Sequence, residues 1–338
     1  HIKDPLLKGI LNIQCGDHGL PPGQVAFPVH CAVMSHYFEG ACYPMGGGAG
    51  IVKAMTNAFK RHSGEIKTGK KVKKILIENK KAFGVELETG DQYFAKNVVS
   101  NADPTVTYLQ LAGKENLSNS LVKKLQKTRY SVTSVILFLT LDLDVRAAGM
   151  DSGNIWMMKD KDMEKTFREM TRENILEDEE FPAVFISCTT LKDPVSYNGR
   201  YHNFEVVTFL SYDSFKEFEG LDDYHGERYS AFKTRISEKL MNSLEKVLPG
   251  AKAHVVQMEL GTPKTNEYYI NSTRGNVYGT EKTLSQVGPF AFSNKSEIKN
   301  LFLCGASTLS HGVGGATNSG VATSAKILNC RAEDLLIP

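Results

Sequence analysis

The chain has 338 residues, 41% of them hydrophobic and 23% charged, which is the composition of a globular protein with one large domain or two smaller ones. Its 40 basic residues are balanced by 38 acidic ones, so there is no electrostatic basis for binding nucleic acid. Six scattered cysteines form no C-x-x-C pair, which favours a reducing compartment, and the absence of a signal-peptide pattern argues against secretion.

The first 45 residues are expected to be helical and rich in loops. Residues 5–13 form an apolar pattern typical of a helix, and a second apolar stretch at 25–38 carries His30 and His36. A metal site would need further ligands at set spacing, so packing is the favoured role of both histidines. Because the sequence starts at His1 close to a helix, we expect a piece of a longer protein; a tag or processing scar before a complete domain is the alternative.

A glycine-rich loop from Tyr43 to Gly50 leads into a predicted helix over 51–61. It is not a dinucleotide fingerprint, because the third required glycine falls on Ile51 and no strand stands directly before it. The loop either opens a helix or lets the backbone approach a bound cofactor or substrate.

The segment 64–103 has the alternating pattern of a β-meander. Apolar and polar residues alternate between Gly- and Asn-containing turns, and the last strand ends in Asn101-Ala-Asp-Pro104. The predicted strands are residues 65–68, 72–78, 83–88, 92–95 and 97–100.

The middle of the chain, 105–250, alternates between helices and strands, which indicates an α+β domain around a wide pocket. No nucleophile elbow and no H-E-x-x-H motif occurs in it. We expect a helix at 117–128 with Ser118 as its cap, a second helix at 224–247 and a surface helix within 160–180. Strands are expected at 131–143, 183–188 and 204–210.

After a strand at 255–260 and an aromatic, turn-rich segment at 266–279, the chain closes on its most informative stretch. Residues 301–304 form a short apolar strand, followed by a glycine-rich turn and a helix of small residues from about Ala316. Bare N–H groups at such a turn suit an anion or an electron-rich ring edge. A tight crossover packed against a sheet explains the spacing equally well.

The order of motifs resembles the FAD-dependent phytoene desaturase family, in particular its carotenoid isomerase and retinol saturase branch. The resemblance rests on several motifs in a fixed order. After P-M-G-G before a helix come G-E-I-x-T-G-x-x-V-x-K-I-x-I-E, G-V-E-L-E-T-G-D, V-V-S-N-A-D-P, G-T-P, G-N-V-Y-G and N-L-F-L-C-G-A-S-T, and the start of the chain carries D-P-L-L-K-G-I-L-x-I-Q-C-G-D-H-G-L-P-P and H-Y-F-E-G-A-C-Y-P-M-G-G. It is strong over 1–104 and 255–330 and loose through 150–225. The family's G-x-G-x-x-G fingerprint and ribose-binding acidic residue are not in this sequence, and neither is roughly the first third of a family-length chain.

The resemblance implies an α/β and α+β fold, in which an incomplete Rossmann-like FAD-binding domain with a β-meander joins a mixed-sheet substrate domain with helices. It assigns 1–45 to a helical segment of the substrate domain and 46–104 to the FAD domain with the meander. It further assigns 105–254 to the substrate domain and 255–338 to the C-terminal part of the FAD domain. An N-terminal nucleotide-binding segment is expected as the missing partner.

The resemblance also implies which residues face the cofactor and the substrate, although it names no catalytic residue. The adenine end of FAD would meet a strand at Val72, and its ribityl and phosphate region would meet the turn after the last strand, at Gly305, Ala306 and Ser307. The flavin ring would meet the start of the last helix, at Gly314, Gly315 and Ala316, and the first glycine loop, at Gly46 and Gly47. The polar substrate candidates are Tyr43, Arg274 and Tyr278. For Arg274 and Tyr278, the alternative is a role as surface turn residues.

By resemblance, the protein is an FAD-dependent desaturase, saturase or isomerase of carotenoid- or retinoid-like polyenes, with a role for NAD(P) left open. Aromatic and aliphatic residues of 27–43, 131–143 and 183–210 would line a dry tunnel. A flavin amine-oxidase-like enzyme on another substrate and a non-catalytic lipid-binding fragment are the alternatives. We expect this piece alone to bind FAD weakly or not at all and to be inactive.

For location, the resemblance implies the cytoplasm or a membrane surface, including that of an organelle. A core helix is the favoured role of the apolar residues 6–13, and contact with a membrane surface is the alternative.

Overall fold

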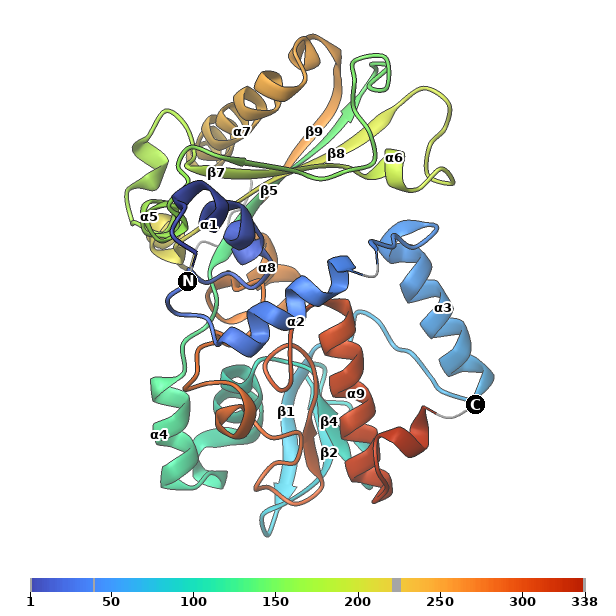
Figure 1. Cartoon of the computed structure of the whole chain (residues 1–338). Coiled ribbons are helices and arrows are strands. Elements are labelled where there is room, and N and C mark those ends of the chain that lie inside the picture. Colours follow the sequence, from blue (N-terminus) through green and yellow to red (C-terminus); the bar gives the residue numbers. More distant parts are fainter. Residues whose placement is uncertain (1, 39, 221–225, 337–338) are drawn as a thin grey trace.

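Two lobes, each with its own sheet and core, make up the computed structural model, which describes residues 2–38, 40–220 and 226–336 (Figure 1). The described strands form a five-stranded sheet, a three-stranded meander and a two-stranded parallel sheet, all accompanied by helices. This mixture confirms the predicted α/β and α+β class.

The upper lobe in Figure 1 is built on the five-stranded sheet, in which all neighbouring strands are antiparallel. Strand β5 pairs residue by residue with β8, from Thr133 opposite Leu210 to Leu141 opposite His202. Buried and partly exposed side chains alternate along β8, as expected for a strand with one face in a core. The strand order is β6 (Ile155–Met158), β7 (Ala183–Cys188), β8 (His202–Leu210), β5 (Thr133–Leu141) and β9 (Val255–Gly261).

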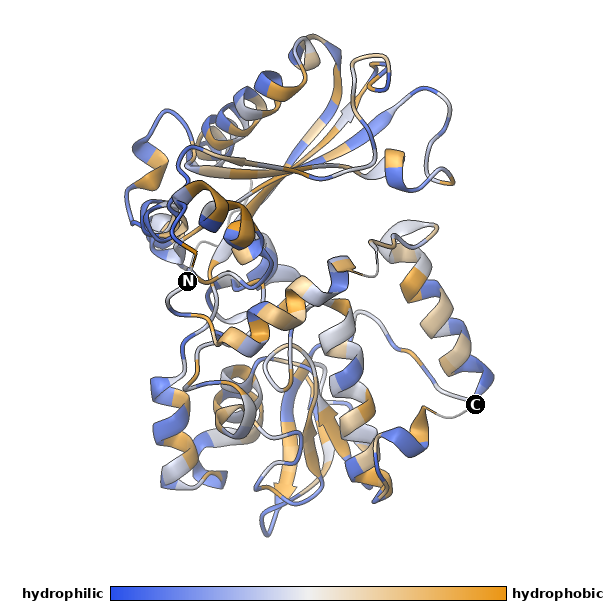
Figure 2. Ribbon diagram, in the orientation of Figure 1, coloured by the Kyte–Doolittle hydropathy of each residue, from blue (hydrophilic) through white to orange (hydrophobic). Residues whose placement is uncertain are grey.

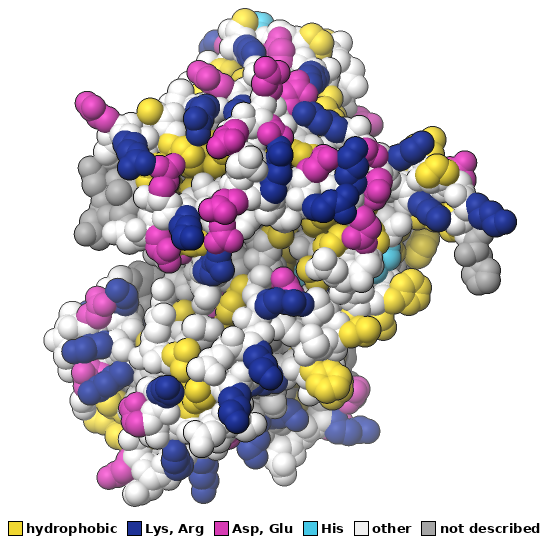
Figure 3. Space-filling model, turned by 90° about the vertical axis from the view of Figure 1, so that its left-hand side faces the viewer, with side chains coloured by type: hydrophobic (Ala, Val, Ile, Leu, Met, Phe, Trp, Pro, Cys, Tyr) yellow, Lys and Arg dark blue, Asp and Glu magenta, His cyan; other side chains and the backbone are white. Residues whose placement is uncertain are grey.

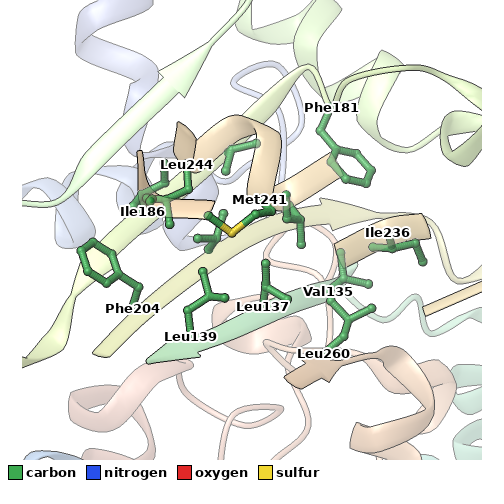
Figure 4. Packing of buried hydrophobic residues seen from close by; sticks show 14 of the residues in the cluster. Val135, Leu137, Leu139, Phe181, Ile186, Phe204, Ile236, Met241, Leu244 and Leu260 are labelled. Carbon is green, nitrogen blue, oxygen red and sulfur yellow. The ribbon is translucent and has the colours of Figure 1, made fainter. Parts of the chain in front are cut away.

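Helix α7 (Glu227–Val247) covers one face of this sheet. Its buried residues include Phe232, Ile236, Leu240 and Leu244, which recur every four residues and form one apolar stripe. Figure 4 shows this stripe packing onto side chains of the strands such as Leu137, and Figure 2 shows apolar and polar residues alternating along the helix. The burial of this stripe makes the upper lobe's core the largest in the described chain.

The lower lobe contains the meander and the parallel pair. Strands β1 (Val72–Glu78), β2 (Lys81–Leu87) and β3 (Gln92–Phe94) form the antiparallel meander. Strands β4 (Val98–Ser100) and β10 (Leu301–Leu303) lie parallel, so their carboxyl ends meet at one edge of the sheet. In open α/β sheets, ligands bind in the crevice at that edge.

The remaining helices lie around both lobes. An irregular π-helical segment, Val106–Gly113, packs on β1, and α4 (Asn119–Lys127) begins at the predicted cap Ser118, whose hydroxyl accepts from the Leu121 N–H. The others are α1 (Pro5–Asn12), a 3₁₀ helix η1 (Ile13–Asp17), α2 (Phe27–Phe38), α3 (Gly47–Arg61), α5 (Met163–Met170), α6 (Thr189–Lys192), α8 (Pro263–Ile270) and α9 (Gly312–Leu328).

Three local expectations are wrong. Residues 65–68 form no strand: the segment is short and largely exposed, and no neighbouring strand pairs with it. Helix α9 begins at Gly312 rather than near Ala316, so the glycines belong to its first turn. The apolar side chains of α1 are exposed instead of forming a core helix, with Leu6 at 58% and Ile10 at 57% exposure.

The division into lobes also differs in detail from the expected segments. Strand β9, expected at the start of the C-terminal cofactor segment 255–338, hydrogen-bonds to β5 in the upper sheet. Helix α4, expected in the substrate segment 105–254, packs into the lower core through Leu125.

On the face shown in Figure 3, acidic side chains occur among the basic ones, so the whole face does not carry one sign of charge. The same view shows that the molecule is hollowed between the lobes. Among the residues that the structure describes, no helix combines the length and apolar character needed to cross a bilayer.

Candidate functional site at the junction of the lobes

The first turn of α9 presents uncapped backbone N–H groups at the carboxyl edge of β10. The N-cap residue His311 makes no side-chain capping bond. A Cβ built on Gly312 or Gly314 would meet no atom within 4 Å, so both glycines face open space. Gly315 differs, because its Cβ would lie 2.6 Å from the Ser310 carbonyl carbon. The helix start is therefore accessible to a large ligand, with the partial positive charge of its dipole toward it.

The turn between β10 and α9 is held by buried hydrogen bonds. The Gly305 N–H donates to Ser319 Oγ at 2.9 Å, and Ser307 Oγ accepts from the Thr280 N–H at 3.2 Å. Gly305 adopts φ +97°, and its Cβ would lie 2.1 Å from Asn101 Oδ1, so only glycine fits there. Gly305 and Ser307 are buried, and Ala306 is partly exposed.

Tyr278 and His311 connect this turn to the N-terminal segment. Their rings lie 4.7 Å apart between centroids. The Tyr278 hydroxyl donates to the Gly16 carbonyl at 3.0 Å, and His311 Nε2 donates to the Asp17 carbonyl at 2.7 Å. Burial, and secondarily the charge of Asp17, raises the pKa of Tyr278, so the phenol keeps its proton.

The imidazoles at the junction stay neutral at physiological pH. Burial, reinforced by the charges of His30 and His311, lowers the pKa of His18 to about 3. Burial likewise lowers the pKa of His311 to about 4. With Nε2 of His311 donating to Asp17, its buried Nδ1 has no hydrogen-bond partner among the described residues. A free acceptor atom is thus directed into the junction.

An apolar crevice begins next to these residues. It runs from Gly16 over the face of the upper sheet opposite α7 and is lined by Trp156, Met158, Met163, Phe167, Met170, Ala183, Val184, Phe185, Val207, Thr208 and Phe209. Its free volume of about 20 Å³ is far below the roughly 300–1,000 Å³ of a ligand pocket. Three methionines line it, and the flexibility of this side chain makes it the adaptable part of the lining.

This crevice replaces the expected open tunnel. Only the strands β6, β7 and β8 reach it. Strand β5, within the expected lining segment 131–143, turns its buried side chains into the core under α7 instead. The aromatic residues of α2, such as Phe27 and Phe38, are exposed.

The other predicted residues lie in separate places. Arg274 pairs with Asp213, stacks on the Tyr212 ring at 5.2 Å and lines a charged cavity of about 580 Å³ with Arg129 and Glu164. Neither Tyr278 nor the glycines of α9 line that cavity.

The first glycine loop contacts the upper lobe. The Gly46 N–H donates to Asp193 Oδ2 at 3.0 Å, and Gly46 and Gly47 both have positive φ. Tyr43 is exposed, with its hydroxyl oxygen 3.5 Å from a Cβ built on Gly47. Val72 starts β1 opposite Leu87. Their proximity to a cofactor stays a prediction.

The chain matches the family described as flavin containing amine oxidoreductase over residues 24–328. It belongs to this family. It is 27% identical over 337 residues to the all-trans-retinol 13,14-reductase of Macaca fascicularis, an alignment covering 95% of this chain and 55% of the relative. It is 30% identical over 287 residues to prolycopene isomerase 2, chloroplastic, of an Oncidium hybrid cultivar, covering 82% of this chain and 44% of the relative. These relatives confirm the resemblance to the carotenoid isomerase and retinol saturase branch.

Solved structures show the same fold. An oxidoreductase from Methanosarcina mazei superimposes with a TM-score of 0.66 at 20% identity, covering 96% of this chain and 65% of that one. A putrescine oxidase superimposes with a TM-score of 0.54 at 15% identity, covering 84% and 53%. The chain spans about half the length of the curated relatives it matches.

The residues of this chain fit one end of FAD. The open first turn of α9 and its uncapped N–H groups suit the polar edge of a flavin ring. The pyrophosphate end would need a G-x-G-x-x-G turn after a strand, which this sequence does not contain.

Several residues at the junction were given no role in the sequence analysis. Cys15, Asp17 and His18 belong to a motif that carries the family resemblance, but they lie in and just after η1, where Asp17 meets His311 from almost 300 positions away. Lys282 was also missed, although its ammonium group is buried and donates to the carbonyls of Tyr278 at 3.2 Å, Thr280 at 2.7 Å and Ala306 at 2.8 Å. A lysine between two turn-rich segments gives no hint of this.

Lys282 makes a pH-dependent contribution to stability. Burial lowers its pKa from 10.5 to about 8, partly opposed by the charge of Asp103. Between these two values the unfolded chain binds more protons than the folded one, so the Lys282 contribution to the free energy of unfolding rises with pH. A difference of one bound proton changes the free energy of unfolding by about 1.4 kcal/mol per pH unit. Over the interval between the two pKa values, we therefore expect the free energy of unfolding to rise by about 3 kcal/mol in total.

Urea unfolding of Lys282→Met at pH 7.5 to 10.5 should lack this rise relative to the parent chain, whereas the exposed Lys326→Met should keep it. Parallel curves for the parent and Lys282→Met would contradict a depressed lysine pKa.

Proposed function

We propose that the protein is an FAD-dependent oxidoreductase or isomerase that acts on polyene lipids of carotenoid or retinoid type. One observation supports this most strongly: an apolar crevice begins at Gly16, and the Gly16 carbonyl holds Tyr278 beside the open start of α9. A polyene bound in the crevice would therefore end next to the first turn of α9, where the flavin ring would bind. The names of the retinol reductase and prolycopene isomerase relatives agree with such a substrate.

When bound, FAD would supply hydride transfer to or from the polyene. The chain's own residues would bind and orient the substrate. Trp156, Phe185 and Phe209 are partly exposed and would present ring faces and edges to an extended apolar molecule, which would cover them from water. The phenolic proton of Tyr278 is donated to the Gly16 carbonyl, so its oxygen would accept a hydrogen bond from a polar end group of the substrate.

We propose further that a polypeptide carrying the nucleotide fingerprint pairs along β4. Among the described strands, β4 has only β10 as a neighbour in its sheet, and Val99 in it is 47% exposed. Helix α3 also exposes apolar side chains, including Val52, Met55 and Phe59. An unpaired edge and an apolar helix face are stabilised by covering them. In this proposal, FAD binding requires that polypeptide.

The position of the flavin ring is tested by filling the open space at Gly314. In the full-length protein, Gly314→Leu places a side chain where the ring would lie, and we expect FAD binding at least about tenfold weaker, or about 1.4 kcal/mol. The matched control Ser324→Leu, exposed in the C-terminal half of the same helix, should bind FAD normally. Isothermal titration with FAD measures both; equal affinities would refute this placement.

The substrate class can be tested through Trp156, the single tryptophan of the 338-residue sequence. Because it lines the crevice, a bound retinoid whose absorption overlaps tryptophan emission should quench the fluorescence saturably. The diamine putrescine should not, and Trp156→Phe should lose the signal while still binding the retinoid in a filtration assay. If retinoid binds without quenching, the crevice is not its site; if no retinoid binds, the proposed substrate class is wrong.

We also propose that the protein contacts membranes peripherally through α1. Leu6, Leu7, Ile10 and Leu11 are exposed on this helix, with Lys3 and Lys8 nearby to meet anionic headgroups. The protein should co-float with phosphatidylcholine–phosphatidylserine vesicles, and Leu6→Ser/Ile10→Ser should float less. Val256→Ser, at an equally exposed apolar position on β9, is the control. Equal flotation of all three proteins would exclude α1 as the contact.

A further inference from the structure

A cysteine and two histidines converge beside the junction, on a segment that the flavin chemistry does not use. Cys15 belongs to η1 and His18 follows it, and both side chains are completely buried. A 3₁₀ helix has about three residues per turn, so side chains three positions apart point the same way. The C-x-x-H spacing therefore places the thiol and the imidazole on one side of the turn, toward His30 on α2.

The geometry of the three side chains suits a single metal ion. One ligand atom from each of Cys15, His18 and His30 lies within 4.8 Å of the other two. His18 Nε2 and His30 Nδ1 are 3.2 Å apart, and their rings are nearly perpendicular at 77°. With metal–nitrogen bonds of about 2.0–2.1 Å, two nitrogens on a tetrahedral ion stand about 3.3 Å apart.

The surroundings favour a cation over an unmetallated cluster. The carboxylates of Asp17 and Glu164 both act electrostatically on the Cys15 thiol. A direct hydrogen bond between the two imidazoles explains the 3.2 Å contact but leaves the thiol without a role.

We propose that Cys15, His18 and His30 form a metal site that binds Zn²⁺ through one thiolate and two imidazoles. Thiolate and imidazole ligands select Zn²⁺ over Mg²⁺ and Ca²⁺, which prefer oxygen ligands. Binding replaces the thiol proton, which leaves to solvent, and water completes the tetrahedron. The sequence interpretation that His30 is a packing residue is revised by this proposal.

The site would fix the loop that supports the junction. Gly16 and Asp17 lie between the two ligands Cys15 and His18, and their carbonyls receive the hydrogen bonds of Tyr278 and His311. A bound ion would tie η1 to α2 and so hold these two carbonyls in place. Its role is a positioning one, and its existence does not depend on the proposed flavin activity.

Cobalt titration tests the site directly. The reduced protein, treated with a chelator and dialysed, should take up one Co²⁺ per chain and develop the visible bands of a tetrahedral ion with a thiolate-to-cobalt charge-transfer band. Stoichiometric Zn²⁺ should abolish both. Loss of a ligand should weaken binding at least as much as loss of an outer-shell partner, about tenfold. Cys15→Ser should therefore also lose the charge-transfer band, and His30→Ala should weaken binding without removing it.

The matched control is Cys188→Ser, because Cys188 is buried beside one histidine only, with Sγ 3.9 Å from His202 Nδ1. It should leave the spectrum unchanged. His30 is only half-buried, so His30→Ala keeps the test valid if Cys15→Ser fails to fold. No cobalt spectrum at stoichiometric metal, an unchanged spectrum in Cys15→Ser, or unchanged affinity in His30→Ala would each overturn the proposal.

Discussion

Two hydrogen bonds between distant segments define the junction on which the functional interpretation depends. Tyr278 donates to the Gly16 carbonyl and His311 donates to the Asp17 carbonyl. Tyr278 ends the loop that leaves the upper lobe, His311 caps α9, and the two acceptors are neighbours on η1. These contacts hold the mouth of the apolar crevice against the start of α9. Without them, a substrate site and a cofactor site would have no fixed relation.

The fold supplies this junction through two independent cores. The upper core under α7 fixes the strands that line the crevice, and the lower core fixes the parallel pair that aims α9. Buried polar groups then join the lobes. Asp103 Oδ2 accepts from the Thr273 N–H at 2.6 Å and from Asn276 Nδ2 at 3.0 Å, and Lys282 binds three carbonyls on the other side of the same loop. Satisfied buried networks of this kind specify one arrangement, because each missing partner costs free energy.

Local periodicity sufficed to predict most of the regular elements. The strand at 183–188, the helix within 25–38 and the capping role of Ser118 follow from pattern and cap chemistry alone. The errors share a cause. Gly312, Gly314 and Gly315 have low helix propensity, yet they lie in the first turn of α9, because the preceding strand and the Ser310 packing fix the turn. The segment 65–68 has a strand pattern but finds no partner.

The candidate site was predictable only in part, since its members come from opposite ends of the chain. The glycines and Tyr278 could be singled out by their motifs, but Arg274 lies in another cavity. The meeting of Cys15 and His18 with His30, and the contact of Lys282 with Ala306, are long-range and follow from no spacing rule. Pattern recognises what one segment does locally, whereas a site of this kind is a property of the tertiary fold.

A crystal structure of the full-length, flavin-loaded protein with a bound polyene would test the central claim most directly. The account predicts electron density for the ring against the first turn of α9, beside His311, and for the polyene in an opened crevice next to Trp156. Density for either molecule in the charged cavity beside Arg274, with the crevice still closed, would contradict it.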